Sequence, residues 1–310
     1  MSERVFVALG TASQVPTRWR NHSGYFLRWD DEGILFDPGE GTQRQMIGAG
    51  VSVSEITRIF ISHFHGDHCL GLAGIIQRLS LDNVQHPVHV YYPASGQQYY
   101  DNLRHAAIFH DTTILIDHPI SESGKIFEND KFMLETKLLD HSVETWGLRL
   151  QERDDVTFIP EKLAAFGISG PDIRLLRAQG WIDLADGRRV ELTDVSNPRF
   201  GQSFAFVIDT RLCPAANELA DNVDMLVCEA TFLSDRSAEA ARYGHMTASD
   251  AASLARASGA DLLILTHFSQ RYPSTAPFLE EAAAIHANVI AVRDGERVPI
   301  PHRQRVITSL

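Results

Sequence analysis

The chain has 310 residues, of which 44% are hydrophobic and 22% are charged, and its formal net charge is -12. This ordinary globular composition excludes disordered, collagen-like and coiled-coil proteins, and the negative charge argues against a protein that coats nucleic acid non-specifically. No run approaches the ~20 apolar residues of a membrane helix, and the three cysteines are too few and too scattered for a disulfide framework. We therefore expect a soluble, cytoplasmic protein without a membrane partner.

Short apolar and β-branched runs predict strands at residues 5–9, 25–29, 34–37, 59–62, 88–92, 114–116 and 132–139, with helices at 70–81 and 95–108. Further along, predicted strands at 203–208, 225–229 and 262–266 alternate with predicted helices at 234–243, 247–257 and 276–287. These stretches together indicate an α/β fold of two sheets flanked by helices. We expect one domain over residues 1–310, from which residues 152–199 form an inserted arm with a short helix at 172–179.

A dense histidine motif follows the predicted strand at 59–62: His63-Phe-His65-Gly66-Asp67-His68. Residues two apart in extended backbone face the same side, so His63 and His65 can bind one metal ion. Asp67 and His68, just beyond a glycine that permits a sharp bend, can reach a second ion. The competing interpretation is a histidine cluster in a surface loop, which this spacing makes the weaker one.

Three more potential ligands follow predicted strands: His141, Asp209 and His267. Taken singly, Asp209 is more often a turn residue, and the two histidines are more often ordinary surface or core residues. Strand ends can converge on one rim of a sheet sandwich, however, and the motif at 63–68 gives them a partner. We therefore predict that these three residues are also metal ligands.

If two metal ions bind, the simplest assignment is His63, His65 and His141 on the first, Asp67, His68 and His267 on the second, and Asp209 between them. Two such ions can lower the pKa of a shared water and stabilise a displacement at phosphorus. Asp67 is then the natural general base, because a carboxylate tied to a metal can orient the attacking hydroxide. The pattern predicts a hydrolase.

The order His63-x-His65-x-Asp67-His68, His141, Asp209, His267 resembles the metallo-β-lactamase superfamily. That resemblance implies a four-layer αββα sandwich of two mixed sheets, with the metals at one edge. Within the superfamily, accessory segments are similar to the ribonuclease Z family of tRNA 3′-processing endonucleases: Leu35-Phe-Asp-Pro-Gly39-Glu-Gly41-Thr42-Gln43, Glu229-Ala-Thr231-Phe, His245-Met-Thr247-Ala and Leu265-Thr-His267-Phe-Ser269-Gln-Arg271-Tyr272.

The resemblance implies a homodimeric endoribonuclease with two Zn2+ per subunit, which acts on precursor tRNA rather than DNA and leaves a 3′ hydroxyl on the tRNA. Glu229 and His245 would donate a proton to the leaving oxygen, as an imidazolium held by a carboxylate can. The substrate-binding residues that it implies are Ser269, Arg271 and Tyr272 at the scissile phosphate, and Gly170, Pro171, Arg174 and Arg177 on an arm that grips the tRNA elbow. The simpler interpretation of the arm is a hairpin insertion with a surface helix.

The segment Pro16-Thr17-Arg18-Trp19-Arg20-Asn21 is similar to the family's PxKxRN loop, which senses a 3′ CCA. Arg18 stands where lysine is usual. The positive charge is kept, but a planar guanidinium replaces the compact ammonium group of lysine. The alternative is a solvated basic turn. Two further departures are Cys228, in place of a histidine before Glu229, and Met246, in place of a serine after His245.

Other functions are compatible with parts of this pattern. A general phosphodiesterase or another hydrolase of small molecules would need the same metal site but not the arm. A non-catalytic RNA-binding protein or sensor would have no use for Asp67, Glu229 and His245. A redox di-iron site is disfavoured, because position 65 is a histidine rather than an acidic residue.

Overall fold

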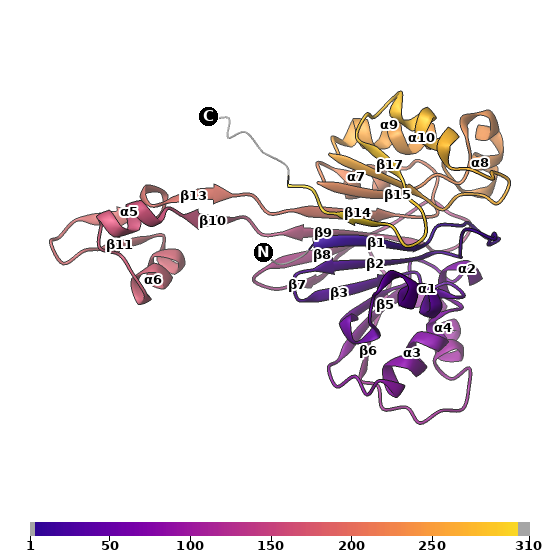
Figure 1. Ribbon diagram of the computed structural model, residues 1–310, viewed down its shortest axis with the longest axis horizontal. Helices are drawn as coiled ribbons and strands as arrows, with labels where there is room; N and C mark the ends of the chain where they lie inside the picture. The colour runs from indigo at the N-terminus through magenta and orange to yellow at the C-terminus, as the bar shows by residue number, and fades with distance from the viewer. Residues whose placement is uncertain (1–3, 303–310) are drawn as a thin grey trace.

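The computed structural model describes residues 4–302 and confirms the predicted fold class. Two seven-stranded sheets pack face to face, and helices cover both outer faces (Figure 1). Two smaller sheets, of two strands each, lie in the arm. Among the described residues, no helix is long and apolar enough to cross a membrane.

The first sheet is formed almost entirely by the N-terminal half of the chain. Its order is β18 (Arg297–Pro299), β1 (Arg4–Gly10), β2 (Gly24–Trp29), β3 (Glu32–Phe36), β4 (Arg58–Phe60), β5 (Val88–Pro93) and β6 (Leu115–Ile120). The helices on its outer side are α1 (Thr42–Ala49), α3 (Leu72–Leu81) and α4 (Gln97–Arg104). Helix α3 buries Leu72, Ile75, Ile76 and Leu79, the spacing of an amphipathic helix on a sheet.

The second sheet combines strands from both halves of the chain. Its order is β17 (Val289–Ala291), β16 (Leu262–Thr266), β15 (Met225–Glu229), β14 (Ser203–Val207), β9 (Trp146–Glu152), β8 (Phe132–Leu138) and β7 (Gly124–Glu128). The helices α7 (Pro214–Ala220), α9 (Ala248–Ser258) and α10 (Ala276–Ala283) cover it, and α8 (Ser237–Tyr243) lies near one end. The parallel strands β14, β15 and β16 are buried throughout, as expected for a sheet covered on both faces.

Aromatic side chains fill the space between the sheets. Phe36 contacts Phe206 across the sandwich with ring centroids 4.6 Å apart, and Phe6 lies 6.1 Å from Phe204. Separate, mainly aliphatic clusters lie beneath the helices on each outer face. The cluster between the sheets and the two clusters beneath the helices hold the sheets firmly against each other. Side chains at the strand ends of both sheets therefore keep fixed positions relative to one another.

The segment between β9 and β14 projects away from the sheets as an arm (Figure 1). Its stalk is the antiparallel pair β10 (Asp155–Phe158) and β13 (Ser196–Arg199). Beyond the stalk lie α5 (Pro160–Ala165), α6 (Pro171–Gln179), β11 (Trp181–Asp183) and β12 (Arg189–Glu191). The arm has a small core of its own, whose buried members are Leu163, Ile168, Leu176, Ile182, Val190 and Val195.

The strands predicted from sequence are present, with shifts of a few residues at their ends, but several helix predictions were wrong in extent. The helix predicted at 70–81 is α3, from residue 72, and a separate turn, α2 (Gly66–Cys69), precedes it because the chain bends at Leu70 and Gly71. The helix predicted at 95–108 ends at Arg104, and the one predicted at 276–287 ends at Ala283. Helix α1 was not predicted, because it buries only Thr42 and Met46 and has no apolar period.

Candidate metal centre

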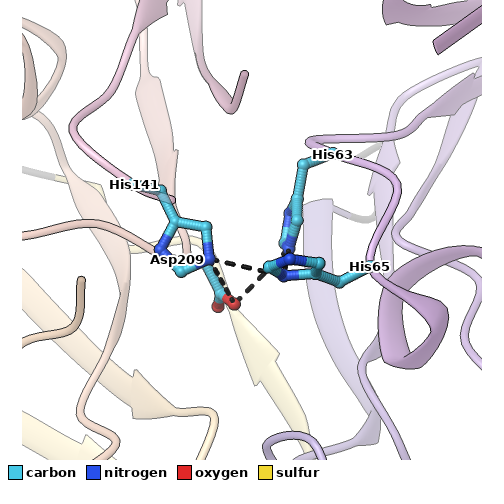
Figure 2. A group of neighbouring side chains, drawn as sticks. All are labelled: His63, His65, His141 and Asp209. Carbon is cyan, nitrogen blue, oxygen red and sulfur yellow. Dashed lines mark hydrogen bonds and ion pairs between the residues drawn. The ribbon is translucent and has the colours of Figure 1, made fainter. Parts of the chain in front are cut away.

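Seven side chains that could ligate metal ions converge at one edge of the sandwich, from segments far apart in the sequence. Those that could hold one ion are His63, His65, His141 and Asp209, and a second group is Asp67, His68 and His267, with potential ligand atoms within 4.8 Å of one another in each group. A third group joins Asp209 and His267 to His245. Figure 2 shows the first group, with His63 and His65 facing His141 and Asp209.

The local backbone explains how these residues reach the same point. The chain leaves β4 in extended conformation, so His63 and His65 point the same way, and His65 ends the extended stretch as the N-cap of α2. Asp209 and His267 each follow a buried strand and adopt left-handed backbone, with φ of 51° and 63°. Such φ values are uncommon for residues other than glycine and cluster at functional sites.

The donor atoms are close-packed. His63 Nε2 lies 3.0 Å from His65 Nδ1, and His65 Nδ1 lies 3.4 Å from His141 Nε2. On the other side, His68 Nε2 lies 3.3 Å from both His267 Nε2 and Asp67 Oδ2. The Asp209 carboxylate faces both groups, at 3.6 Å from His63 and 3.1 Å from His267.

Hydrogen bonds on the far side of the rings determine which nitrogen faces the cluster. Three histidines engage an outside oxygen through Nδ1 at 2.9 Å: His68 the Asp37 carboxylate, His141 the Gly244 carbonyl and His267 the Thr231 hydroxyl. Carboxylate and carbonyl oxygens can only accept, so Nδ1 carries the proton in the first two rings. The Nε2 of a neutral ring is then left with a bare lone pair that points into the cluster.

A positive charge is therefore needed at the centre. One Asp209 oxygen, Oδ1, is buried without a hydrogen-bond donor, 3.1 Å from His267 Nε2. Burial alone would lower the pKa of His68, but the Asp209 and Asp67 carboxylates raise it well above its usual range, so the cluster favours a positive charge here. Burial lowers the pKa of His63 and His65, which favours the neutral rings that bind metals. Burial alone would raise the pKa of Asp67, but His68 and His267 lower it, so the carboxylate stays ionised. Imidazole and carboxylate donors around an orphaned oxygen fit divalent metal ions.

Beside the donors lies a pair that the resemblance assigned to proton transfer. His245 Nδ1 is 3.1 Å from both oxygens of Glu229, which is fully buried at the end of β15. Glu229 also accepts hydrogen bonds from the backbone N–H of Thr210 and Met246 and from the Thr231 hydroxyl. Burial alone would lower the pKa of His245, but the Glu229 carboxylate raises it to about 9.

His245 and five of the seven donors line a cavity of about 530 Å³; these donors are His65, Asp67, His141, Asp209 and His267. Ser269, Arg271 and Tyr243 also line it. Tyr272 is set back, where its hydroxyl accepts a hydrogen bond from the backbone N–H of Leu233 at 3.2 Å. The cavity therefore offers polar and cationic groups next to the metal ligands.

The loop at 16–21 flanks this cavity, but its residues differ in exposure. Arg18 is exposed and lies over the Trp19 ring, with its guanidinium carbon 5.1 Å from the ring centroid. Arg20 is buried and donates to the backbone carbonyls of Ser269, at 3.1 Å, and Tyr272, at 2.8 Å. Asn21 donates to the Glu40 carbonyl at 2.7 Å. Arg20 and Asn21 thus fasten the loop to its neighbours, whereas Arg18 faces solvent.

The arm residues lie far from the cavity. Gly170 has φ of 52°, and Pro171 begins α6, so the chain turns sharply between α5 and α6. Arg174 on that helix is exposed. Arg177 is held by Asp155, whose two carboxylate oxygens accept from Nη1 at 2.8 and 2.7 Å.

Sequence reasoning missed the residues that support the ligands. Asp37 is fully buried and accepts from the Ser62 backbone and hydroxyl at 2.7 Å as well as from His68. Asp37 lies within the segment from Leu35 to Gln43 that resembles the family, but nothing local in that segment assigns Asp37 to a histidine 31 residues away. Thr231, between His267 and Glu229, was missed for the same reason.

Two of the three cysteines, Cys69 and Cys228, and the Met246 departure have structural explanations. Cys228 and Met246 are buried in the cluster beneath α7 and α9, and Met246 needs only its backbone N–H to reach Glu229. Cys69 is buried beside the motif, where its Sγ donates to the His65 carbonyl at 3.3 Å and burial raises the pKa of the thiol to about 12. It is therefore a thiol, not a thiolate ligand, at neutral pH.

Comparison with known proteins agrees with this architecture. A family model described as "Metallo-beta-lactamase superfamily" matches residues 17–149, and one described as "Beta-lactamase superfamily domain" matches residues 165–268. The structure of human tRNase Z, short form, has the same fold, with a TM-score of 0.70, 23% identity, and coverage of 96% of this chain and 99% of that one.

Relatives identify the family more closely. The chain is 54% identical to a protein named Ribonuclease Z from Nocardia farcinica, over 98% of this chain and 100% of the relative. It is 50% identical to a Ribonuclease Z from Streptomyces avermitilis, with the same coverage of both chains. The chain therefore belongs to the ribonuclease Z family of the metallo-β-lactamase superfamily.

Proposed function

We propose that the protein is a metal-dependent endoribonuclease that removes 3′ trailers from tRNA precursors and leaves a 3′ hydroxyl on the tRNA. The observation that carries this proposal is the match to proteins named Ribonuclease Z along practically the whole chain, the arm included. The donor cluster lies at a cavity that His245 also lines, and His245 is held by the buried Glu229, so the groups that such a reaction needs are together. We place the enzyme in the cytoplasm, with its precursor substrates.

The cofactor that we propose is two Zn2+ per subunit, because the donors are mostly imidazole and form two groups with Asp209 between them. When bound, two such ions activate a water molecule and stabilise charge at the reacting phosphodiester. Asp67, ionised and at the cavity wall, would accept the proton of the attacking water. His245 would donate from Nε2 to the leaving oxygen, since Glu229 holds Nδ1 and keeps the ring protonated.

We propose that the substrate contacts the cavity through Ser269 and Arg271 and the arm through Gly170, Pro171 and Arg174. The arm leaves the sheet at the ends of β9 and β14 opposite to those next to His141 and Asp209, so it points away from its own metal centre (Figure 1). A homodimer resolves this geometry, because the arm of one subunit can then hold the tRNA that the other subunit cuts.

The test is cleavage of a tRNA precursor with a 3′ trailer by the wild type, by Asp67→Ala, and by the wild type with a chelator. We expect cleavage after the discriminator base by the metal-loaded wild type alone. Hydrolysis of bis(p-nitrophenyl) phosphate without precursor cleavage would instead identify a phosphodiesterase of small molecules. Precursor cleavage that persists in Asp67→Ala, or after complete metal removal, would contradict the proposed site.

A further inference from the structure

Within residues 4–302, the arm is joined to the rest of the molecule through its stalk alone. Strands β10 and β13 pair from Asp155 opposite Arg199 to Phe158 opposite Ser196. Figure 1 shows no other element beside the arm beyond this pair. A two-stranded ribbon is flexible by itself, so the direction of the arm depends on what fixes the base of the stalk.

A buried carboxylate lies at that base. Glu152, the last residue of β9, is only 6% exposed. Its oxygens accept from Arg4 at 2.6 and 2.9 Å, from Arg199 at 2.9 Å, and from the backbone N–H of Gln202 at 2.9 Å. Glu152 thus joins β1 of the sandwich to β13 of the stalk.

Charged side chains continue from Glu152 in both directions. Towards the sandwich, Arg4 donates to Asp30 at 2.9 Å and lies 4.6 Å from the centroid of the Trp29 ring. Towards the arm, Arg199 lies 3.6 Å from Asp155. The series ends where Asp155 accepts from Arg177 on α6, inside the arm.

We call this series the stalk relay. Its six members alternate in charge from the sandwich to the arm: Asp30, Arg4, Glu152, Arg199, Asp155 and Arg177.

The relay has the features that make ion pairs directional. An isolated ion pair on the surface contributes little to stability. In a network, however, a planar guanidinium that donates to carboxylates fixes both the distance and the orientation of its partner side chains. Burial alone would raise the pKa of Glu152, but the hydrogen bonds from Arg4, Gln202 and Arg199 lower it, so the carboxylate stays charged. An unpaired charge at this buried position would be costly, which keeps both arginines in place.

We propose that the stalk relay sets the angle of the arm, and that Asp155 and Arg177 are positioning residues rather than RNA contacts. The functional part of this inference rests on the proposed function: an arm that holds tRNA must present the cleavage point to a distant metal centre. An arm that samples many angles presents that point less often. Loosening the relay should therefore weaken productive binding of the precursor without changing the chemistry at the metal centre.

The angle can be measured without any substrate. Spin labels at Ser169→Cys, an exposed position between α5 and α6 of the arm, and at Glu280→Cys, an exposed position on α10, report the distance from arm to sandwich. The labelled chain carries Cys213→Ser, since the other cysteines are buried, and is diluted with unlabelled chain so that only distances within one subunit count. We expect Asp155→Asn to broaden or shift the distance distribution.

The matched control is Asp186→Asn. It makes the same change in charge on the same arm, but it breaks only the local pair of Asp186 with Arg188, whose side chains are 2.8 Å apart. We expect its distance distribution to be that of the wild type. The double variant Asp155→Asn with Arg177→Gln should be no broader than Asp155→Asn alone, because both changes break one link.

The kinetic readout uses the same variants with their natural cysteines. For Asp155→Asn we expect KM for precursor tRNA to rise roughly five- to tenfold, because a mobile arm lowers the effective concentration of the cleavage point at the metal centre. The kcat for the precursor and the hydrolysis of bis(p-nitrophenyl) phosphate should not change. Asp186→Asn should leave all three unchanged.

The outcomes separate this inference from the proposed function. A distance distribution that Asp155→Asn leaves unchanged would overturn the role of the relay, and a rise in KM without a change in distance would make these residues RNA contacts instead. A broadened distribution with an unchanged KM would support the relay as the determinant of the angle and contradict the proposed grip of the arm on tRNA.

Discussion

Glu229 is the residue on which the proposed acid depends. Without its carboxylate, burial is the largest remaining influence on His245 and lowers the pKa of the ring. A proton donor is active below its pKa, so the wild-type rate should fall as the pH rises through about 9. In Glu229→Gln we expect this alkaline limb of kcat to move to lower pH, with a loss of about 10²-fold or more at pH 8.

The measurement is the pH profile of kcat for precursor cleavage. Glu280→Gln is the matched control, because Glu280 is exposed on α10 and lies outside the cavity lining. Its profile should be that of the wild type. An alkaline limb that stays in place in Glu229→Gln would show that His245 is not the titrating acid.

Asp37 should control metal affinity without touching the metal. Replacing its carboxylate in Asp37→Asn weakens the acceptor that orients His68 through Nδ1. Losses of such supporting partners typically reduce metal affinity by about 10- to 100-fold. Competition with a chromophoric chelator measures this loss, and Asp82→Asn, which changes an exposed helix end, is the control. Equal affinity in Asp37→Asn and the wild type would contradict the supporting role.

At the scale of elements, the arm is a small folded unit whose core can be tested alone. Leu176 on α6 is fully buried, and a cavity left by Leu176→Ala costs about 2–5 kcal/mol. Because the arm core has only six buried apolar residues, we expect this change to unfold the arm while the sandwich stays folded. KM for precursor tRNA should rise, and hydrolysis of small phosphodiesters should not change.

Hydrogen exchange of the arm amides, together with the two kinetic assays, measures this effect. The adjacent Leu175 is 43% exposed, so Leu175→Ala is a control with the same change in side chain. If precursor cleavage survives loss of protection in the arm, the arm does not grip the substrate.

A residue or helix could be predicted from the sequence where the pattern that identifies it lies in neighbouring residues, and not where it depends on contacts with distant ones. The motif at 63–68 is readable because extended backbone places His63 and His65 on one side, and strand ends made His141, Asp209 and His267 candidates. Asp37 was not predictable, because its partner lies across the chain and a buried aspartate has no periodic signature. Helix α1 was missed because its contacts with the sheet involve few apolar residues.

At the scale of the whole molecule, the metal ligands come from both halves of the chain. His68 and His267, for example, are 199 residues apart and meet at 3.3 Å. Ions that bind the folded state alone stabilise it by mass action, by about 2.7 kcal/mol at 100 times Kd. We expect chelation to lower Tm and added Zn2+ to restore it.

Thermal unfolding with and without Zn2+ measures this stabilisation. His267→Gln should lose most of the Zn2+-dependent rise in Tm, whereas His286→Gln, outside the cluster, should keep it. A rise in Tm of the same size in both variants would mean that Zn2+ binds elsewhere.

Because the arm lies between β9 and β14 in the sequence, the polypeptide can be divided within the arm into two fragments. The turn at Asp186 and Gly187 is exposed, and a break there leaves β1 to β9 on one fragment and β14 to β18 on the other. Neither fragment holds a complete set of ligands, and the second sheet needs strands from both. Two separately produced polypeptides should therefore assemble by pairing β9 with β14. Hydrolysis of a small phosphodiester by the mixture would measure this assembly.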